Sequence, residues 1–128
     1  MLRIRLVLTA VVLFGALGAV VPASAGGVEG VDKAGTCSGA SSWKLSLKPR
    51  DNKIEVEFEV DQNVNGAEWK VVLKHDGDRF FSRTKTTKGP SGSFSVERKV
   101  NDHQGTDKIT ARAENIATSE VCKARASL

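Results

Sequence analysis

The sequence has few of the residues and motifs that carry catalysis or metal binding. Its 128 residues include two histidines, His75 and His103. It has no phosphate-binding glycine loop and no Cys-x-x-Cys or His-Glu-x-x-His pattern. Nothing predicts that a nucleophile and an orienting acid converge on either histidine, so both are expected to be solvated loop residues. We therefore expect no catalytic residue, no cofactor and no metal, and the protein is not expected to be an enzyme.

Long apolar runs are also scarce, and the single one lies at residues 6–21. Its 16 residues are short for a bilayer span, which needs about 20. Arg3 and Arg5 precede it, and an Ala-Ser-Ala sequence at 23–25 follows, as in a cleavable signal peptide. Residues 1–25 are accordingly predicted to be a signal peptide, with an uncleaved anchor as the alternative. The mature protein is expected to be secreted and to meet a membrane only through this peptide before cleavage.

Excess charge of one sign is small once the signal peptide is removed. Loss of Arg3 and Arg5 takes the basic residues from 19 to 17, against 15 acidic residues. This balance favours solubility and argues against general binding of nucleic acid. A nucleic-acid partner is therefore not expected.

Only two cysteines are present, Cys37 and Cys122, and an exported chain of this size allows them one intramolecular pairing. The bond would close a loop of about 85 residues, and the chain-entropy relation makes it worth roughly 4 to 5 kcal/mol. Free or metal-binding cysteines are the alternative, but neither residue has a histidine or acidic cluster near it in sequence. A structural disulfide is the prediction.

What the sequence does contain is period-two alternation, which is typical of half-buried strands. In the clearest segment, Ile54, Val56, Phe58 and Val60 alternate with glutamates. The glycine-rich residues 26–36 are predicted to be a flexible leader, and 37–128 a single domain. Seven strands are expected in that domain, at 43–47, 54–60, 69–73, 79–84, 94–100, 109–113 and 122–128.

The turn between the third and fourth predicted strands contains Asp76-Gly77-Asp78. Asp-Gly tolerates the positive φ angles of a type I′ turn, so a tight hairpin is expected there. A calcium site that uses Asp76 and Asp78, or Asp102 and Asp107, is the alternative reading of these acids. Calcium needs six to eight oxygen ligands, and the turn alone explains the Asp-Gly-Asp sequence.

Seven short antiparallel strands resemble immunoglobulin-like and fibronectin-III-like β-sandwich domains. Trp69 falls in the third strand, where an immunoglobulin domain keeps its core tryptophan. The chain departs from that pattern because strands two and six lack a cysteine pair, and because the absence of tyrosine rules out a tyrosine corner. Its disulfide would instead join the segment before strand one to strand seven.

Several segments also resemble small exported proteins of unassigned function from actinobacteria. They include Cys37-Ser38-Gly39 followed by Trp43, and Phe58-Glu59-Val60-Asp61 followed by Asn63. Ser91-Gly92-Ser93-Phe94, the alternating run from Gly105 to Asn115, and Cys122 complete the set. Most of these are core or turn positions, so the resemblance implies a fold and secretion and brings no activity with it.

An immunoglobulin-like strand order predicts two outer faces of different charge. Strand two would lie between strands one and five, which sets Glu55, Glu57 and Glu59 against Lys44, Lys48 and Lys99 as opposite-charge pairs. Strands three, six and seven would form the other sheet. Its outward cations would be Lys70, Lys74, Lys108, Arg112, Lys123 and Arg125, with Glu114 and Glu120 nearer one end.

These features predict a protein that binds a partner and catalyses no reaction. The basic face is the expected contact, either with an anionic cell-envelope polymer or with an extracellular protein. A plain solvated face is the alternative interpretation of the same residues. The alternative functions are a secreted inhibitor of an extracellular hydrolase and a subunit of an extracellular assembly.

Overall fold

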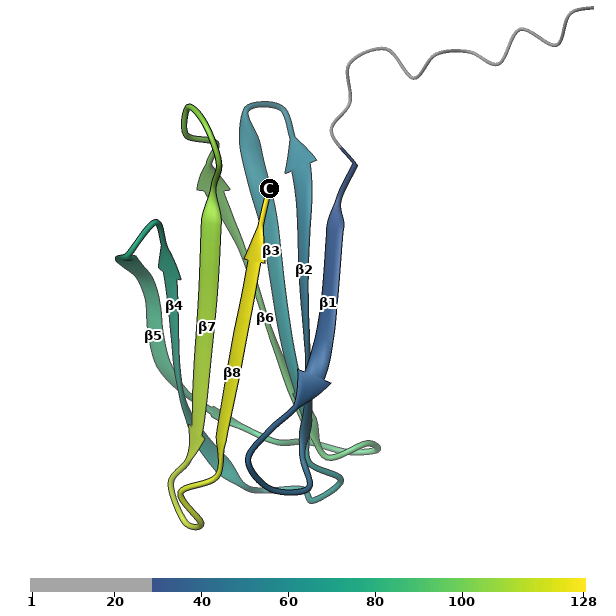
Figure 1. The fold of residues 1–128 in the computed structure, drawn as a ribbon. Coiled ribbons are helices and arrows are strands. Elements are labelled where there is room, and N and C mark those ends of the chain that lie inside the picture. Colours follow the sequence, from purple (N-terminus) through teal and green to yellow (C-terminus); the bar gives the residue numbers. More distant parts are fainter. Residues whose placement is uncertain (1–28) are drawn as a thin grey trace, which may run out of the picture.

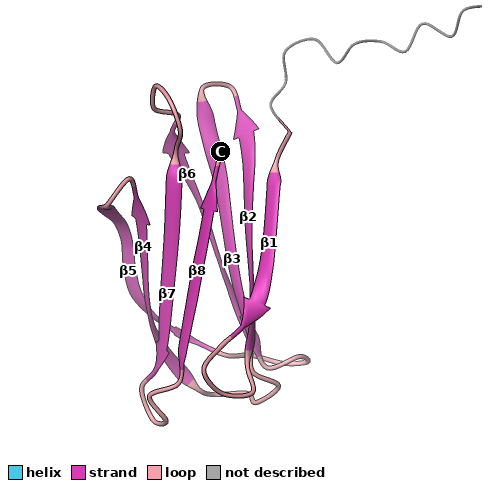
Figure 2. Ribbon diagram, viewed as in Figure 1, coloured by secondary structure: helices cyan, strands magenta, loops and turns pink. Residues whose placement is uncertain are grey.

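The computed structural model describes residues 29–128, which form two antiparallel β-sheets without a helix (Figures 1 and 2). The predicted signal peptide at 1–25 lies outside the described residues. The eight strands are β1 (Val31–Thr36), β2 (Ser42–Arg50), β3 (Lys53–Asp61), β4 (Glu68–His75), β5 (Asp78–Thr86), β6 (Ser93–Asn101), β7 (Lys108–Asn115) and β8 (Val121–Ser127). One sheet has the order β1-β2-β3-β6 and the other β5-β4-β7-β8.

The all-β prediction is confirmed, but the described chain has eight strands where the sequence predicted seven. The additional strand, β1, occupies part of the segment expected to be a flexible leader. It pairs with β2 along its whole length, from Val31 opposite Leu47 to Thr36 opposite Ser42. A Cβ atom on Gly35 would lie 2.6 Å from the ring of Trp43, so a glycine is needed where that ring covers the strand.

The core lies between the two sheets and comes from the predicted alternation. The inward residues of β2, β3 and β6 are large, and Leu45, Leu47 and Phe58 are fully buried. The inward residues of β7 and β8, in the opposite sheet, are mostly alanines. Large side chains of one sheet therefore pack against small side chains of the other. Trp69 of β4 is fully buried in this core, and its ring nitrogen donates a hydrogen bond to Gln62 Oε1 at 3.0 Å.

The predicted disulfide between Cys37 and Cys122 is present and ties the end of β1 to β8. The same junction is held by hydrogen bonds, since Ser38 N donates to Val121 O and Val121 N donates to Ser38 Oγ. The carboxylate of Glu120 accepts three more, from Gly39 N, Ser41 N and Ser41 Oγ. The disulfide and these hydrogen bonds therefore close the same side of the sandwich together.

The Asp-Gly hairpin is confirmed between β4 and β5. Asp76 has a φ of 50° and Gly77 a φ of 90°, the pair of positive values that a type I′ turn requires. This turn lies at the same end of the molecule as the loop between β6 and β7 (Figure 1). The two loops meet because β4 and β7 are antiparallel neighbours, with His75 opposite Ile109.

Candidate functional site

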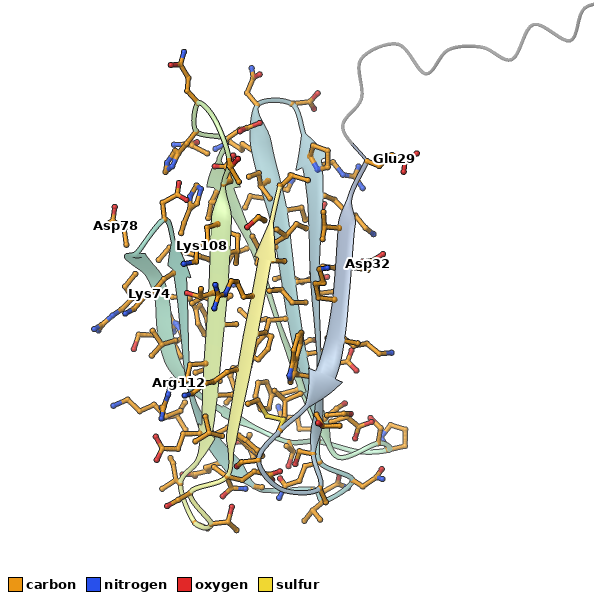
Figure 3. The ribbon with its side chains drawn as sticks, viewed as in Figure 1. Glu29, Asp32, Lys74, Asp78, Lys108 and Arg112 are labelled. Carbon is orange, nitrogen blue, oxygen red and sulfur yellow. A yellow bond between two sulfur atoms is a disulfide. The ribbon has the colours of Figure 1, made fainter. Side chains whose placement is uncertain are left out.

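The outer face of the β5-β4-β7-β8 sheet carries every cation that the sequence assigned to it. Figure 3 shows Lys74, Lys108 and Arg112 on β4 and β7. All six predicted side chains are exposed and alternate with buried residues along their strands, so they point away from the core. They are Lys70, Lys74, Lys108, Arg112, Lys123 and Arg125; Arg79 of β5 joins them, and we call these seven side chains the basic face.

The pairing register of this sheet places two pairs of like charges directly opposite each other, beside one opposite-charge pair, Lys70 with Glu114. Arg112 is the cross-strand partner of Lys123, and Lys74 is the partner of Arg79. Directly opposed like charges destabilise an antiparallel pair by a few tenths of a kcal/mol up to about 1 kcal/mol. The fold therefore keeps two unfavourable pairs on one surface.

Acidic side chains are scarce on the same face. Glu114 contacts Arg112, with Oε2 2.9 Å from Nη1, and Glu68 begins β4 at the far end of the sheet. Glu120, which the sequence placed near this face, instead turns toward residues 39–41 and accepts their hydrogen bonds. The basic face therefore has less compensating negative charge than the sequence predicted.

A shallow groove of about 530 Å³ crosses the basic face. Its volume is within the range of about 300 to 1,000 Å³ that is common for ligand sites. Val72 and Thr110 lie along the groove between the cationic side chains. The cations that border it are Lys74, Arg79, Arg112, Lys123 and Arg125.

The outer face of the other sheet is balanced in charge, as predicted. β3 pairs with β2 and β6 so that Glu59 lies opposite Lys44, while Glu55 lies opposite both Lys48 and Lys99. Glu57 differs from the prediction, because its cross-strand partners are Ser46 and Glu97. The two faces of the sandwich thus differ in composition: on one, glutamates and lysines alternate across strands, with Glu57 opposite Glu97 as a like-charge pair, and on the other, cations predominate.

The prediction that both histidines are solvated loop residues holds for His103 and is wrong for His75. His75 is 5 % exposed and continues the inward side of β4 after Trp69, Val71 and Leu73. Its ring stacks on that of His103, with centroids 3.9 Å apart and planes 11° from parallel. His103 comes from the loop between β6 and β7, and its side chain is half exposed.

Two carboxylates complete this group of side chains. His75 Nε2 lies 2.6 Å from Asp107 Oδ1 and 3.4 Å from Asp76 Oδ2. His103 Nδ1 lies 2.8 Å from Asp76 Oδ2 and 3.9 Å from Asp107 Oδ1. We call these four side chains the His–Asp cluster. Of the four acids considered for calcium, Asp76 and Asp107 belong to it.

Local hydrogen bonds govern the ionisation of the acids around the cluster. The backbone N–H of Lys108, and then the ring of His103, lower the pKa of Asp76. Burial alone would raise the pKa of Asp107, but hydrogen bonds from His103 N–H, His75 and Asp102 outweigh it and lower the pKa. Asp102 hydrogen-bonds to Asp107, and this contact raises the pKa of Asp102.

Comparisons of the chain with protein-family models, with curated proteins and with solved structures found no match. In residues 29–128, no helix has the length and apolar character needed to cross a membrane.

Proposed function

We propose that the protein binds an anionic cell-envelope polymer through the basic face and catalyses no reaction. The observation that carries this proposal is the pairing of Arg112 with Lys123 and of Lys74 with Arg79. A face that serves only solubility does best with both signs interspersed. Retaining directly opposed cations costs stability, and an anionic ligand between them would remove that cost.

The shape of the face suits an extended ligand. Outward residues on one strand recur about every 7 Å, and neighbouring strands lie about 4.8 Å apart, so the cations are regularly spaced over the face. The groove along Val72 and Thr110 gives a chain-like polyanion a path between the cationic side chains. Val64 and Ile116 are the exposed large apolar side chains of residues 29–128. Neither is aromatic, whereas proteins that bind single-stranded nucleic acid stack its bases on aromatic side chains.

The secreted location and the fold family belong to the same proposal. A disulfide in a small all-β domain fits an oxidising compartment, as the signal peptide predicted from residues 1–25 requires. The strand orders support an immunoglobulin-like sandwich to which β1 adds a further edge strand. We place the protein with the small exported actinobacterial proteins that its sequence resembles.

A pelleting assay on isolated cell envelopes tests the proposal. The test variant is Lys74→Glu with Lys123→Glu, which converts both like-charge pairs into opposite-charge pairs. The control is Lys33→Glu with Lys88→Glu, which makes the same change in net charge at exposed residues off the basic face. Chelator is present throughout, so that bound metal does not contribute.

We expect the wild type and the control to pellet at low salt and to be released as salt rises, because the Debye length falls to about 3 Å at 1 M. The test variant should stay in the supernatant although its fold is at least as stable. Equal pelleting of all three proteins would refute the basic face as the contact. A salt-insensitive, stoichiometric complex with a soluble protein would instead support the inhibitor function.

A further inference from the structure

The His–Asp cluster lies outside the groove, at the end of the sandwich where the β4–β5 turn meets the loop between β6 and β7. His75 ends β4 and Asp76 starts the turn, while His103 and Asp107 come from the loop. One nitrogen or oxygen atom from each of the four side chains lies within 4.8 Å of the other three. No step of the proposed polymer binding uses these residues.

We propose that His75, Asp76, His103 and Asp107 bind a divalent transition-metal ion, with Zn²⁺ as the best match. Zinc takes four ligands in a tetrahedron, with bonds of about 2.0 to 2.2 Å to imidazole nitrogen and carboxylate oxygen. Such a tetrahedron sets its donor atoms about 3.3 to 3.6 Å apart. The separations of 2.6, 2.8, 3.4 and 3.9 Å lie on both sides of that value, so the ion would fit after a rearrangement of side chains within the cluster.

Three of the four ligands are held in place by groups behind them. Lys108 N–H donates to Asp76 Oδ1 at 2.8 Å, which leaves Oδ2 directed at the histidines. His103 N–H donates to Asp107 Oδ1 at 2.9 Å, and the backbone of Asp107 exchanges two hydrogen bonds with Leu128. Packing fixes His75, which is almost fully buried. Supporting contacts of this kind orient the ligands of protein metal sites.

His103 is the ligand that must move. Its ring is nearly parallel to that of His75, so an ion in the plane of one ring lies out of the plane of the other. The side chain of His103 is 48 % exposed and has room to rotate. Its backbone hydrogen bond to Asp107 does not depend on the ring, so rotation leaves the loop in place.

The two imidazole nitrogens and two carboxylate oxygens of the cluster favour some metal ions over others. Calcium and magnesium prefer oxygen ligands, and calcium takes six to eight of them. Two imidazoles with two carboxylates suit zinc, copper or nickel. Calcium is therefore the matched negative control for zinc in any titration.

The experiment is a calorimetric titration of the protein with ZnCl₂, followed by NMR of the imidazole rings. The protein is expressed from the full sequence, with its disulfide formed and with no histidine tag. Both histidines of the chain belong to the cluster, so every imidazole signal reports on the site. Asp76→Asn and His103→Gln are the test variants, because asparagine tolerates the positive φ at 76 and residue 103 lies in a loop. Asp78→Asn, two residues from Asp76, is the control.

We expect one Zn²⁺ per chain, a shift of the signals of both histidines on titration, and no binding of Ca²⁺. Each test variant should lose more affinity than the about 10- to 100-fold typical of outer-shell changes. Asp78→Asn should bind as the wild type does. The absence of Zn²⁺ binding would overturn the proposal, and so would binding that either test variant leaves unchanged. Loss of this site would leave pelleting on envelopes unaffected, since that assay contains chelator.

Discussion

Removal of the disulfide tests how the two ends of the domain are joined. Cys37→Ala with Cys122→Ala opens a loop of 85 residues. The chain-entropy relation gives about 4 to 5 kcal/mol for a loop of that length. Domains of this size are stable by only about 5 to 15 kcal/mol, so the loss is large. At about 4 to 8 °C per kcal/mol, the melting temperature should fall by roughly 16 to 40 °C.

The folded structure should nevertheless persist in this variant. Ser38 and Val121 exchange two hydrogen bonds beside the disulfide, and Glu120 holds the adjacent segment. The bond therefore acts mainly by restricting the unfolded chain. Urea titration should show a lower midpoint with an equal or larger m-value, because the unfolded state without the cross-link is more expanded. A stability loss below about 1 kcal/mol would refute this reasoning.

Three further substitutions have expected effects on the free energy of unfolding, each measured by urea titration. Lys123→Glu should raise it by a few tenths of a kcal/mol, because the residue then opposes Arg112 with the opposite charge. Glu120→Gln should lower it by about 1 to 2 kcal/mol, because a charged acceptor of three hydrogen bonds becomes neutral. Arg98→Ala should lower it by about 1 kcal/mol, because the guanidinium lies 4.7 Å from the centre of the Phe81 ring.

Two control substitutions separate these effects from general changes of surface charge: Glu114→Gln for Glu120→Gln, and Lys99→Ala for Arg98→Ala. Glu114→Gln removes an exposed ion pair and should change stability by less than about 1 kcal/mol. Lys99→Ala, next to Arg98, should change it by no more than a few tenths of a kcal/mol. A loss in either control as large as in its test variant would contradict the reasoning.

Much of the fold follows from the sequence because alternation reports burial directly. The outward glutamates of β3 and the inward Ile54, Val56 and Phe58 define that strand without any tertiary information. The neighbours predicted for β3 and β7 are also confirmed. The sequence did not predict β1 because most residues of Val31–Thr36 are exposed, so apolar and polar residues do not alternate there. Gly35 also has no side chain to contribute to such an alternation.

The basic face was predictable for the same reason, since its residues alternate with core residues. Which cations lie opposite each other depends on the pairing register of the strands. The bulge between Leu73 and Lys74 places Arg79 opposite Lys74. Isolated strand patterns do not show such a shift. The turn of Glu120 toward residues 39–41 depends on where the disulfide brings the chain, which is a long-range effect.

The His–Asp cluster was missed although the sequence held a signal for it. His75 extends the inward series Trp69, Val71 and Leu73, and Asp107 precedes the inward series that starts at Ile109. With β4 and β7 as neighbours, the two series end side by side. His75 was predicted to lie in the turn although it shares this parity with the buried residues of β4. Its stacking on His103 depends on a loop whose course no pattern predicts.

Binding of an anionic polymer by the basic face is the function proposed for this protein. The most direct measurement is the pelleting of the Lys74→Glu, Lys123→Glu variant on cell envelopes, next to its urea stability. We expect binding to be lost at low salt while stability is kept or increased, because both changes relieve like-charge pairs. Pelleting that matches the wild type across the salt series would contradict it.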